Sequence, residues 1–244
     1  MRYAILGDIH ANLTALEAVL SDAKGQGVTS LVSVGDVVGY GAAPQEVIQV
    51  LRENQAAVVK GNHDAACTGE LDTTYFNPYA KAAVEWTQQN LTDEDFAWLR
   101  SLPLTSALED LAVAHGTWAT PERFDYVQCM EDAEPSLDQQ PRRVCFVGHT
   151  HVPVTILRHE DQPRELRHTQ ESVIDLKGVT NALVNIGSVG QPRDENPLSA
   201  WGLFDTETET VEIRRVEYDI EAEASRIRGA GLPGILADRL FLGI

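Results

Sequence analysis

Cysteine is scarce in this chain, which has three among its 244 residues, at Cys67, Cys129 and Cys145. No two of them form a C-x-x-C pair, and an odd, sparse set argues against a disulfide framework. We expect all three to be small core residues. Such cysteine usage is typical of a reducing compartment, so the sequence predicts a cytoplasmic protein.

Long apolar runs are absent as well. No stretch approaches the ~18 consecutive apolar residues that cross a bilayer, and the apolar run that follows Arg2 is too short for a signal peptide. We therefore expect neither membrane insertion nor export. Hydrophobic residues make up 43% of the chain and charged residues 23%, which is typical of a soluble globular enzyme rather than a disordered chain.

Positive charge is in short supply, because 19 Lys and Arg residues face 37 Asp and Glu residues, for a formal net charge of −18. A surface this acidic repels nucleic-acid backbones and anionic membranes, so we expect neither as a partner. A small anionic substrate would need a local positive centre, and no basic run supplies one. A bound metal ion is one source of such charge.

Short apolar runs alternate with helical patterns in the first part of the chain. Helices are predicted to begin near Leu13, Pro44, Asn77 and Thr92, from apolar residues at helical spacing, prolines suited to a first turn, and a capping box between Thr92 and Asp95. Nearly continuous apolar runs predict strands buried on both faces at residues 3–6, 31–34, 57–60, 111–114 and 144–147.

After about residue 150 the helical periodicity fades and strands follow one another. They are predicted at residues 152–158, 173–176, 182–186, 200–204 and 211–218, with a helical tail from about residue 220. This order predicts an α/β fold in which two sheets pack together with helices outside. We expect a single domain over residues 1–244.

Five of the seven histidines follow a predicted strand and lie within three residues of a glycine, aspartate or asparagine. The other two, His159 and His168, lie in a charged stretch and are expected to be solvated surface residues. The stretches are Gly7-Asp8-Ile9-His10, Gly61-Asn62-His63-Asp64, Ala114-His115-Gly116 and Gly148-His149-Thr150-His151, and a further strand ends in Gly35-Asp36.

These motifs predict a metal centre, because ligands bind beyond the carboxyl ends of strands in sheets of this kind. Imidazole nitrogens and hard oxygens are the ligands of first-row divalent metals, and eight groups are too many for one four-coordinate ion. In extended segments residues i and i+2 point the same way, so both members of Asp-x-His and His-x-His can face one cluster. The side chains delivered are Asp8, His10, Asp36, Asn62, His63, His115, His149 and His151.

In this order the motifs resemble those of the calcineurin-like metallophosphoesterase superfamily, and within it the small single-domain prokaryotic phosphoesterases. The stretch from Asn185 to Arg193 is similar to that branch too, so the resemblance extends over most of the chain. It implies a four-layer α/β/β/α sandwich of two mixed sheets around a dinuclear metal centre. The expected ions are two divalent ones, with manganese favoured over iron, zinc, cobalt or nickel.

The resemblance also implies a role for each residue. A hydroxide that bridges the metals would attack a phosphodiester or phosphomonoester of a small soluble substrate, and His63 would act as the acid with Asp64 as its orienting partner. By the same resemblance, Asp8, His10 and His151 bind one metal, Asn62, His115 and His149 bind the other, and Asp36 bridges the two.

Some positions depart from relatives within the superfamily. Protein serine/threonine phosphatases carry an arginine shortly after the bridging aspartate, and this chain has none after Asp36, which disfavours a phosphoprotein substrate. Arg193 is either a phosphate contact or a surface ion-pair partner, and Tyr40 either stacks on a leaving group or packs in a loop. A non-enzymatic scaffold or regulatory binding protein of the same fold is the alternative function, and the oligomeric state stays open.

Overall fold

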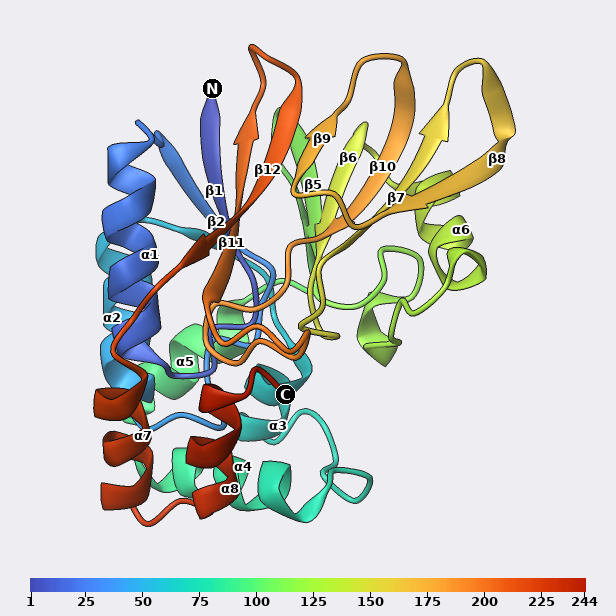
Figure 1. Cartoon of the computed structure of the whole chain (residues 1–244). Coiled ribbons are helices and arrows are strands. Elements are labelled where there is room, and N and C mark those ends of the chain that lie inside the picture. The colour runs from blue at the N-terminus through green and yellow to red at the C-terminus, as the bar shows by residue number, and fades with distance from the viewer.

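Two six-stranded mixed sheets lie face to face in the computed structural model, which describes residues 1–244. Helices cover the outer faces of both sheets, so the layers follow the order helix, sheet, sheet, helix (Figure 1). The predicted four-layer α/β/β/α sandwich is confirmed.

The first sheet has the strand order β3-β2-β1-β11-β12-β9. Its first three strands in this order run parallel to one another, and the rest pair antiparallel. The strands are β1 (Arg2–Leu6), β2 (Ser30–Ser33), β3 (Ala57–Val58), β9 (Val173–Asp175), β11 (Ser199–Asp205) and β12 (Thr210–Val216).

The second sheet has the order β4-β5-β6-β10-β7-β8, with β5, β6 and β10 parallel in its middle. Antiparallel pairs of strands complete it at both edges. The strands are β4 (Thr105–Ala107), β5 (Leu111–Ala114), β6 (Val144–Val147), β7 (Val154–His159), β8 (Gln162–Thr169) and β10 (Val179–Asn185).

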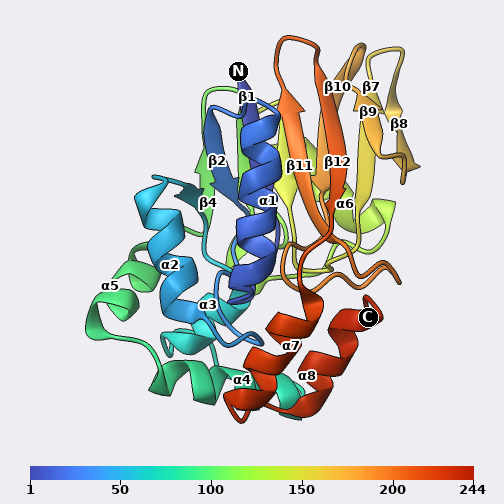
Figure 2. The same cartoon turned by 60° about the vertical axis from the view of Figure 1, so that its left-hand side comes forward.

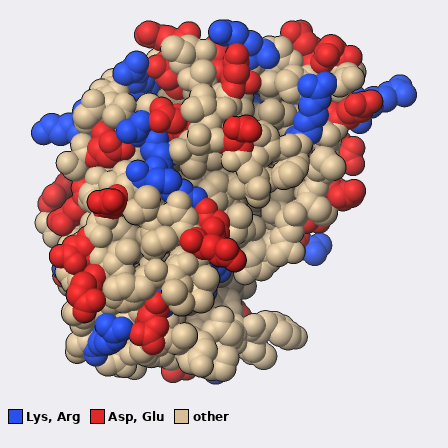
Figure 3. All heavy atoms as spheres, viewed as in Figure 1, with Lys and Arg blue, Asp and Glu red and all other residues tan.

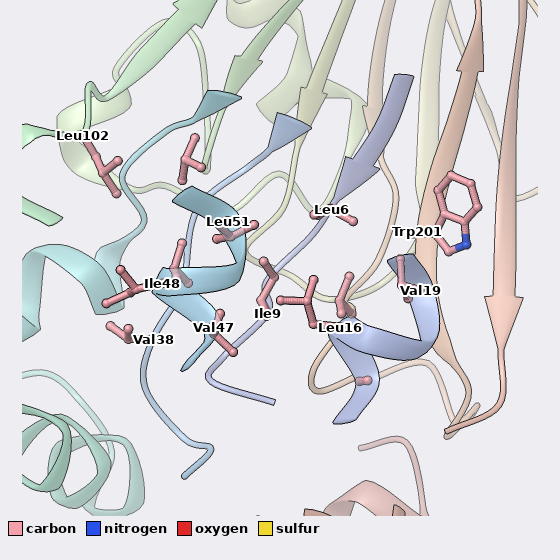
Figure 4. Packing of buried hydrophobic residues seen from close by; sticks show 14 of the residues in the cluster. Leu6, Ile9, Leu16, Val19, Val38, Val47, Ile48, Leu51, Leu102 and Trp201 are labelled. Atoms are coloured by element: carbon pink, nitrogen blue, oxygen red, sulfur yellow. The ribbon is translucent and has the colours of Figure 1, made fainter. Parts of the chain in front are cut away.

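Helices α1 (Leu13–Gly25) and α2 (Pro44–Glu53) cover the outer face of the first sheet, and α6 (Met130–Gln139) covers the second. The side chain of Asn12 caps α1 by accepting from the backbone N–H of Ala15, and Pro44 occupies the first turn of α2. Leu16 of α1 packs with Leu6 and Trp201 of the sheet in one buried cluster (Figure 4). A separate buried cluster, with Ile5 from one sheet and Phe146 from the other, fills the space between the sheets.

The remaining helices lie beyond one end of the two sheets. They are α3 (Asn62–Cys67), α4 (Pro78–Gln89), α5 (Asp93–Ser101), α7 (Ile220–Gly229), α8 (Gly234–Asp238) and the short 3₁₀ helices η1 (Pro121–Arg123) and η2 (Arg239–Phe241). The helical tail α7–α8 packs beside α4, and the contacts bury Ala83, Ile227, Leu236 and Tyr40 in one cluster (Figure 2). No helix combines the length and the apolar character needed to span a bilayer.

Apart from the 3₁₀ helices, four elements have no counterpart among the predicted ones: α3, β4, β8 and α6. Strand β8 is an exposed edge strand whose side chains include Arg164, Glu165 and the exposed His168, so it lacks the apolar signal of a buried strand. Helix α6 contains Pro135 in its interior, which ordinarily counts against a helix. The expectation that all three cysteines are buried is wrong for Cys129, which is exposed.

The core of the first sheet gives a direct test of the packing. We expect Leu16→Ala to lower the free energy of unfolding by about 2–5 kcal/mol, because a fully buried leucine leaves a cavity that its neighbours cannot fill. Leu242→Ala is the control, since that side chain is 58% exposed and its loss costs about 0.5 kcal/mol or less. Urea denaturation measures both, and similar losses for the two variants would contradict the packing in Figure 4.

Candidate metal centre

The predicted site residues meet at one place, at the carboxyl ends of the parallel strands. Strand β1 leads into Asp8 and His10, β2 into Asp36, β5 into His115, and β6 into His149 and His151, while Asn62 and His63 open α3 after β3. All eight side chains are buried. These strand ends lie at the lower side of both sheets in Figure 1, above the helices of the tail and of α3 and α4.

The backbone that delivers these side chains is turned and not extended. Positive φ angles occur at Asp8 (24°), His10 (49°), Asp36 (49°), His149 (71°) and His151 (61°). The expectation that extended geometry makes residues i and i+2 share a face is therefore wrong, although both pairs do converge. Left-handed backbone at non-glycine residues costs of order 1–3 kcal/mol each and is concentrated at functional sites.

Glycines leave the room that the two carboxylates need. A Cβ atom on Gly61 would overlap the carboxylate and backbone N of Asp36, and one on Gly148 would press against Asp8 Oδ2. The motif glycines therefore act here through close approach of backbone to side chain.

One group of donor atoms comprises Asp8, His10, Asp36 and His151, all buried and within 4.8 Å of one another. His10 Nδ1 lies 3.0 Å from the carbonyl of Val38, and His151 Nδ1 lies 2.6 Å from that of Gln191. A carbonyl only accepts, so each Nδ1 carries the proton and each Nε2 keeps a lone pair. The two Nε2 atoms face each other at 3.1 Å, an arrangement that a cation would stabilise.

A second group comprises Asp36, His115 and His149. His115 donates through Nδ1 to the carbonyl of Val34 at 3.0 Å, which again leaves Nε2 bare. That Nε2 lies 3.0 Å from His149 Nδ1 and 2.9 Å from Asn62 Oδ1. Two imidazole nitrogens and an amide oxygen thus converge on one point.

Asp36 belongs to both groups. Its Oδ2 lies 3.5 Å from His10 Nε2 and 3.5 Å from His115 Nε2, so one oxygen stands between the two histidine sets. Its Oδ1 accepts from the backbone N–H of His63 at 2.8 Å, which fixes the carboxylate in this orientation.

The electrostatics of the cluster favour a bound cation. Burial raises the pKa of Asp8 to about 7 and, with the nearby Asp64 carboxylate, raises that of Asp36. Burial lowers the pKa of His10 and His151, and it lowers that of His149 to about 2. Asp8 Oδ2 is buried and has no hydrogen-bond partner. A buried carboxylate oxygen that lacks a partner, beside unprotonated imidazoles, fits a divalent metal.

His63 stands beside the two donor groups. Its ring centroid lies 4.9 Å from that of His10 and 4.4 Å from that of Tyr40, and its Nδ1 has no hydrogen-bond partner. Burial, and secondly the positive charge of Arg193, lower the pKa of His63 to about 3. The ring is therefore neutral at neutral pH. A neutral imidazole still has one N–H to donate.

The expected pairing of Asp64 with His63 is wrong. The Asp64 carboxylate accepts from the backbone N–H groups of Val37 and Val38 through Oδ1, and from that of Gly61 through Oδ2. Asp64 therefore ties the start of α3 to the turn that carries Asp36. The sequence suggested a neighbour in space because the two residues adjoin, but adjacent residues on a helix point about 100° apart.

Arg193 and Tyr40 both lie next to the centre. The guanidinium of Arg193 is 5.6 Å from the Tyr40 ring centroid and donates to Gln191 Oε1. No carboxylate pairs with Arg193, so it is not the surface ion-pair partner that was one alternative. Tyr40 is buried, and its ring contacts those of His10 and His63, so it packs in its loop as one alternative had it.

One contributor, Tyr126, escaped the sequence analysis. The ring of Tyr126 stacks on His149 with centroids 3.8 Å apart and an interplanar angle of 16°. Tyr126 also lines a cavity of about 280 Å³ beside His63, together with aromatic side chains from other loops. Nothing in the local sequence around Tyr126 marks it, because it lies between η1 and α6 in a segment without periodicity.

Two mixed sheets with a buried Asp and His cluster at a shared edge define a metal-binding α/β protein. The family profile described as the calcineurin-like phosphoesterase superfamily domain matches residues 1–209. The chain belongs to this superfamily.

The chain is also similar to individual proteins along nearly its whole length. Uncharacterized protein MJ0912 of Methanocaldococcus jannaschii is 36% identical to this chain in an alignment 248 residues long. The alignment includes 98% of this chain and 97% of that one. A metallophosphoesterase from Sphaerobacter thermophilus has a similar crystal structure, with a TM-score of 0.85, 38% identity and coverage of 100% and 99%. Hypothetical protein PH1004 from Pyrococcus horikoshii shares the fold, with a TM-score of 0.79, 22% identity and coverage of 100% and 98%.

The pKa directions predict how metal affinity depends on pH. The pKa of Asp8 is raised to about 7, so below pH 7 a metal ion that binds there must displace a proton. For each proton displaced, the affinity for Mn²⁺ should fall about tenfold with each pH unit below 7. His149, with a pKa of about 2, holds no proton to displace above pH 4. Calorimetric titration with Mn²⁺ between pH 8 and pH 5 measures this, and an affinity that stays constant over the range would contradict it.

Proposed function

We propose that this protein is a metal-dependent phosphoesterase that uses two divalent ions to hydrolyse a phosphoester of a small soluble molecule. The observation that carries the proposal is the position of Asp36 Oδ2, at 3.5 Å from a histidine of each donor group. One shared carboxylate between two sets of ligands is the arrangement that a two-metal site needs.

The proposed ligand sets follow the two donor groups. Asp8, His10 and His151 would hold one ion, Asn62, His115 and His149 would hold the other, and Asp36 would serve both. Nitrogen and oxygen ligands of this mixture accept several first-row metals, among which we propose manganese. When bound, the ions would supply positive charge for a phosphate and a water of lowered pKa.

The chain itself would position the phosphate and the leaving group. Arg193 has no carboxylate partner and carries its charge next to the centre, so we assign it to the phosphate oxygens. His63 lines the adjoining cavity and donates an N–H to the leaving oxygen. An anionic phosphate nearby would raise the pKa of His63 from its low value, which favours proton donation in the complex.

The residues that follow Asp36 indicate which substrates the protein prefers. The next residues are Val37 and Val38, so no arginine clamps a phosphoprotein there, and we propose a small diester or monoester as substrate. All seven proposed ligands and His63 are present, which argues against a scaffold that has lost catalysis.

The C-terminal tail belongs to the same functional unit. Leu236 and Leu240 of the tail are buried in one cluster with Tyr40, whose ring contacts His10 and His63. We propose that residues 1–244 form one domain, because the tail supports a wall of the centre.

Separate substitutions distinguish ligand from acid. Asp36→Ala should lose metal and activity together, because one carboxylate serves both ions. His63→Ala should keep its metal content while hydrolysis of an ester with a poor leaving group falls about 10²–10⁴-fold. Elemental analysis of each variant and rates for an alkyl and a nitrophenyl ester measure these effects. Since nitrophenolate leaves with little protonation, its rate should fall much less.

Two outcomes would contradict these assignments. Loss of metal from His63→Ala, to the same extent as from Asp36→Ala, would make His63 a ligand. A wild-type protein that binds metal and hydrolyses no phosphodiester or phosphomonoester would overturn the phosphoesterase proposal itself.

Arg193 gives an independent test of phosphate recognition. Arg193→Gln removes a charge-assisted contact worth about 1.5–3 kcal/mol, so kcat/KM should fall about 10- to 100-fold for every phosphoester tested. Arg164→Gln on the exposed strand β8 removes the same charge far from the centre and serves as the control. Equal effects of the two substitutions would show that only the net charge matters.

A further inference from the structure

The cavity beside His63 is built from aromatic side chains. It has a volume of about 280 Å³, near the lower end of ligand pockets, and it opens directly next to Asn62, His63 and His149. Its walls come from separate segments of the chain: the loop after β2, the α3–α4 connection, and the segment after η1. The aromatic members are Tyr40, Tyr75, Phe76, Phe124 and Tyr126.

The charge of this aromatic cavity is unusual for so acidic a chain. Its lining includes no aspartate, glutamate or lysine, and its one arginine, Arg123, pairs with Asp125 at 2.9 Å. Figure 3 shows charged side chains scattered mainly over the top and the left of the visible face, whereas the surface below the notch on the right is mostly uncharged. An uncharged aromatic lining suits an apolar planar group better than a second phosphate.

Two of these tyrosines are more exposed to solvent than is usual for large aromatic side chains. Tyr75 is 96% exposed and Tyr126 is 49% exposed. Large aromatic side chains normally bury most of their surface, because their burial stabilises the fold. Tyr75 contributes little to the core, which leaves its ring available to a ligand.

The position of the cavity identifies which part of a substrate enters it. His63 lies in its wall, and His63 is the residue that we assign to the leaving oxygen. Arg193 lines a different cavity, which shares Tyr126 with this one, and it does not line the aromatic cavity. The phosphate therefore lies at the metal centre, and the group that departs extends into the aromatic cavity.

We propose that the leaving group of the substrate carries a planar aromatic ring, as in a nucleoside or an aryl alcohol, and that this ring binds in the aromatic cavity. The inference rests on the proposed function and adds the substrate class. In the reaction water adds to phosphorus, the bond from phosphorus to the leaving oxygen breaks, and that oxygen takes a proton to become the alcohol.

Matched substrate pairs test the proposal. Adenosine 5′-phosphate and ribose 5-phosphate share the same ester bond, and only the first has a base. Benzyl phosphate and cyclohexylmethyl phosphate both carry a ring, and only the ring of the first is aromatic. The methyl diesters of all four compounds serve as substrates if the enzyme cleaves only diesters. We expect kcat/KM with Mn²⁺ to favour the aromatic member about 5- to 100-fold, the range for stacking of one base on aromatic side chains. A preference in the first pair alone identifies a nucleoside, and one in the second alone a simple aryl alcohol.

A substitution in the α3–α4 connection assigns the effect to the cavity. Tyr75→Ala should reduce the preference for the aromatic member about 5- to 10-fold, because one exposed ring supplies only part of the stacking. Tyr75→Phe should retain it. Tyr79→Ala is the matched control, since Tyr79 is also exposed and nearby in the chain but does not line the cavity.

The outcomes separate this inference from the proposed function. Equal rates within both pairs would overturn the inference and leave the phosphoesterase intact. If no ester is hydrolysed, the proposed function fails, and calorimetric titrations of the protein with free adenosine and with benzyl alcohol decide the inference. Binding of either compound that is weakened by Tyr75→Ala and kept by Tyr79→Ala supports an aromatic occupant, and binding of neither overturns it.

Discussion

A single buried carboxylate, that of Asp36, joins the two halves of this molecule at their functional edge. It follows a strand of the first sheet, and its Oδ2 is equally distant from His10 of that sheet and His115 of the second. Anionic oxygen and imidazole lone pairs are costly to gather in the interior without a compensating positive charge. The carboxyl ends of parallel strands from both sheets therefore meet around a buried cluster whose chemistry favours a cation.

The convergence of these eight side chains could be predicted from the sequence because the information there is local. Each proposed ligand stands within a few residues of a buried apolar strand and of a glycine, and strands with a common direction bring their ends together. What local pattern could not reveal was the shape of the connections. The side chains of Asp8 and His10 converge through left-handed turns, and Asp64 turns away from His63 to bind backbone N–H groups of the preceding loop.

The elements that sequence patterns missed share a physical reason. Strand β8 pairs through its backbone with β7, and its exposed polar side chains carry no trace of that pairing. The aromatic cavity is assembled from connections that have no periodicity, so its members are far apart in sequence and become neighbours only when both sheets are in place. Fold and metal centre are thus encoded locally, whereas the surroundings that select a substrate are encoded by long-range packing.

The left-handed turns restrict how such a site can change during evolution. Aspartate, asparagine and histidine are the non-glycine residues most often found with positive φ. They are also the residue types that supply oxygen and nitrogen to a metal. At Asp8, His10, Asp36, His149 and His151 the left-handed backbone and a bound ion would therefore select from the same short list. An exchange within that list replaces one donor atom by another while the chain keeps its path, so metal preference can diverge among relatives that retain one architecture.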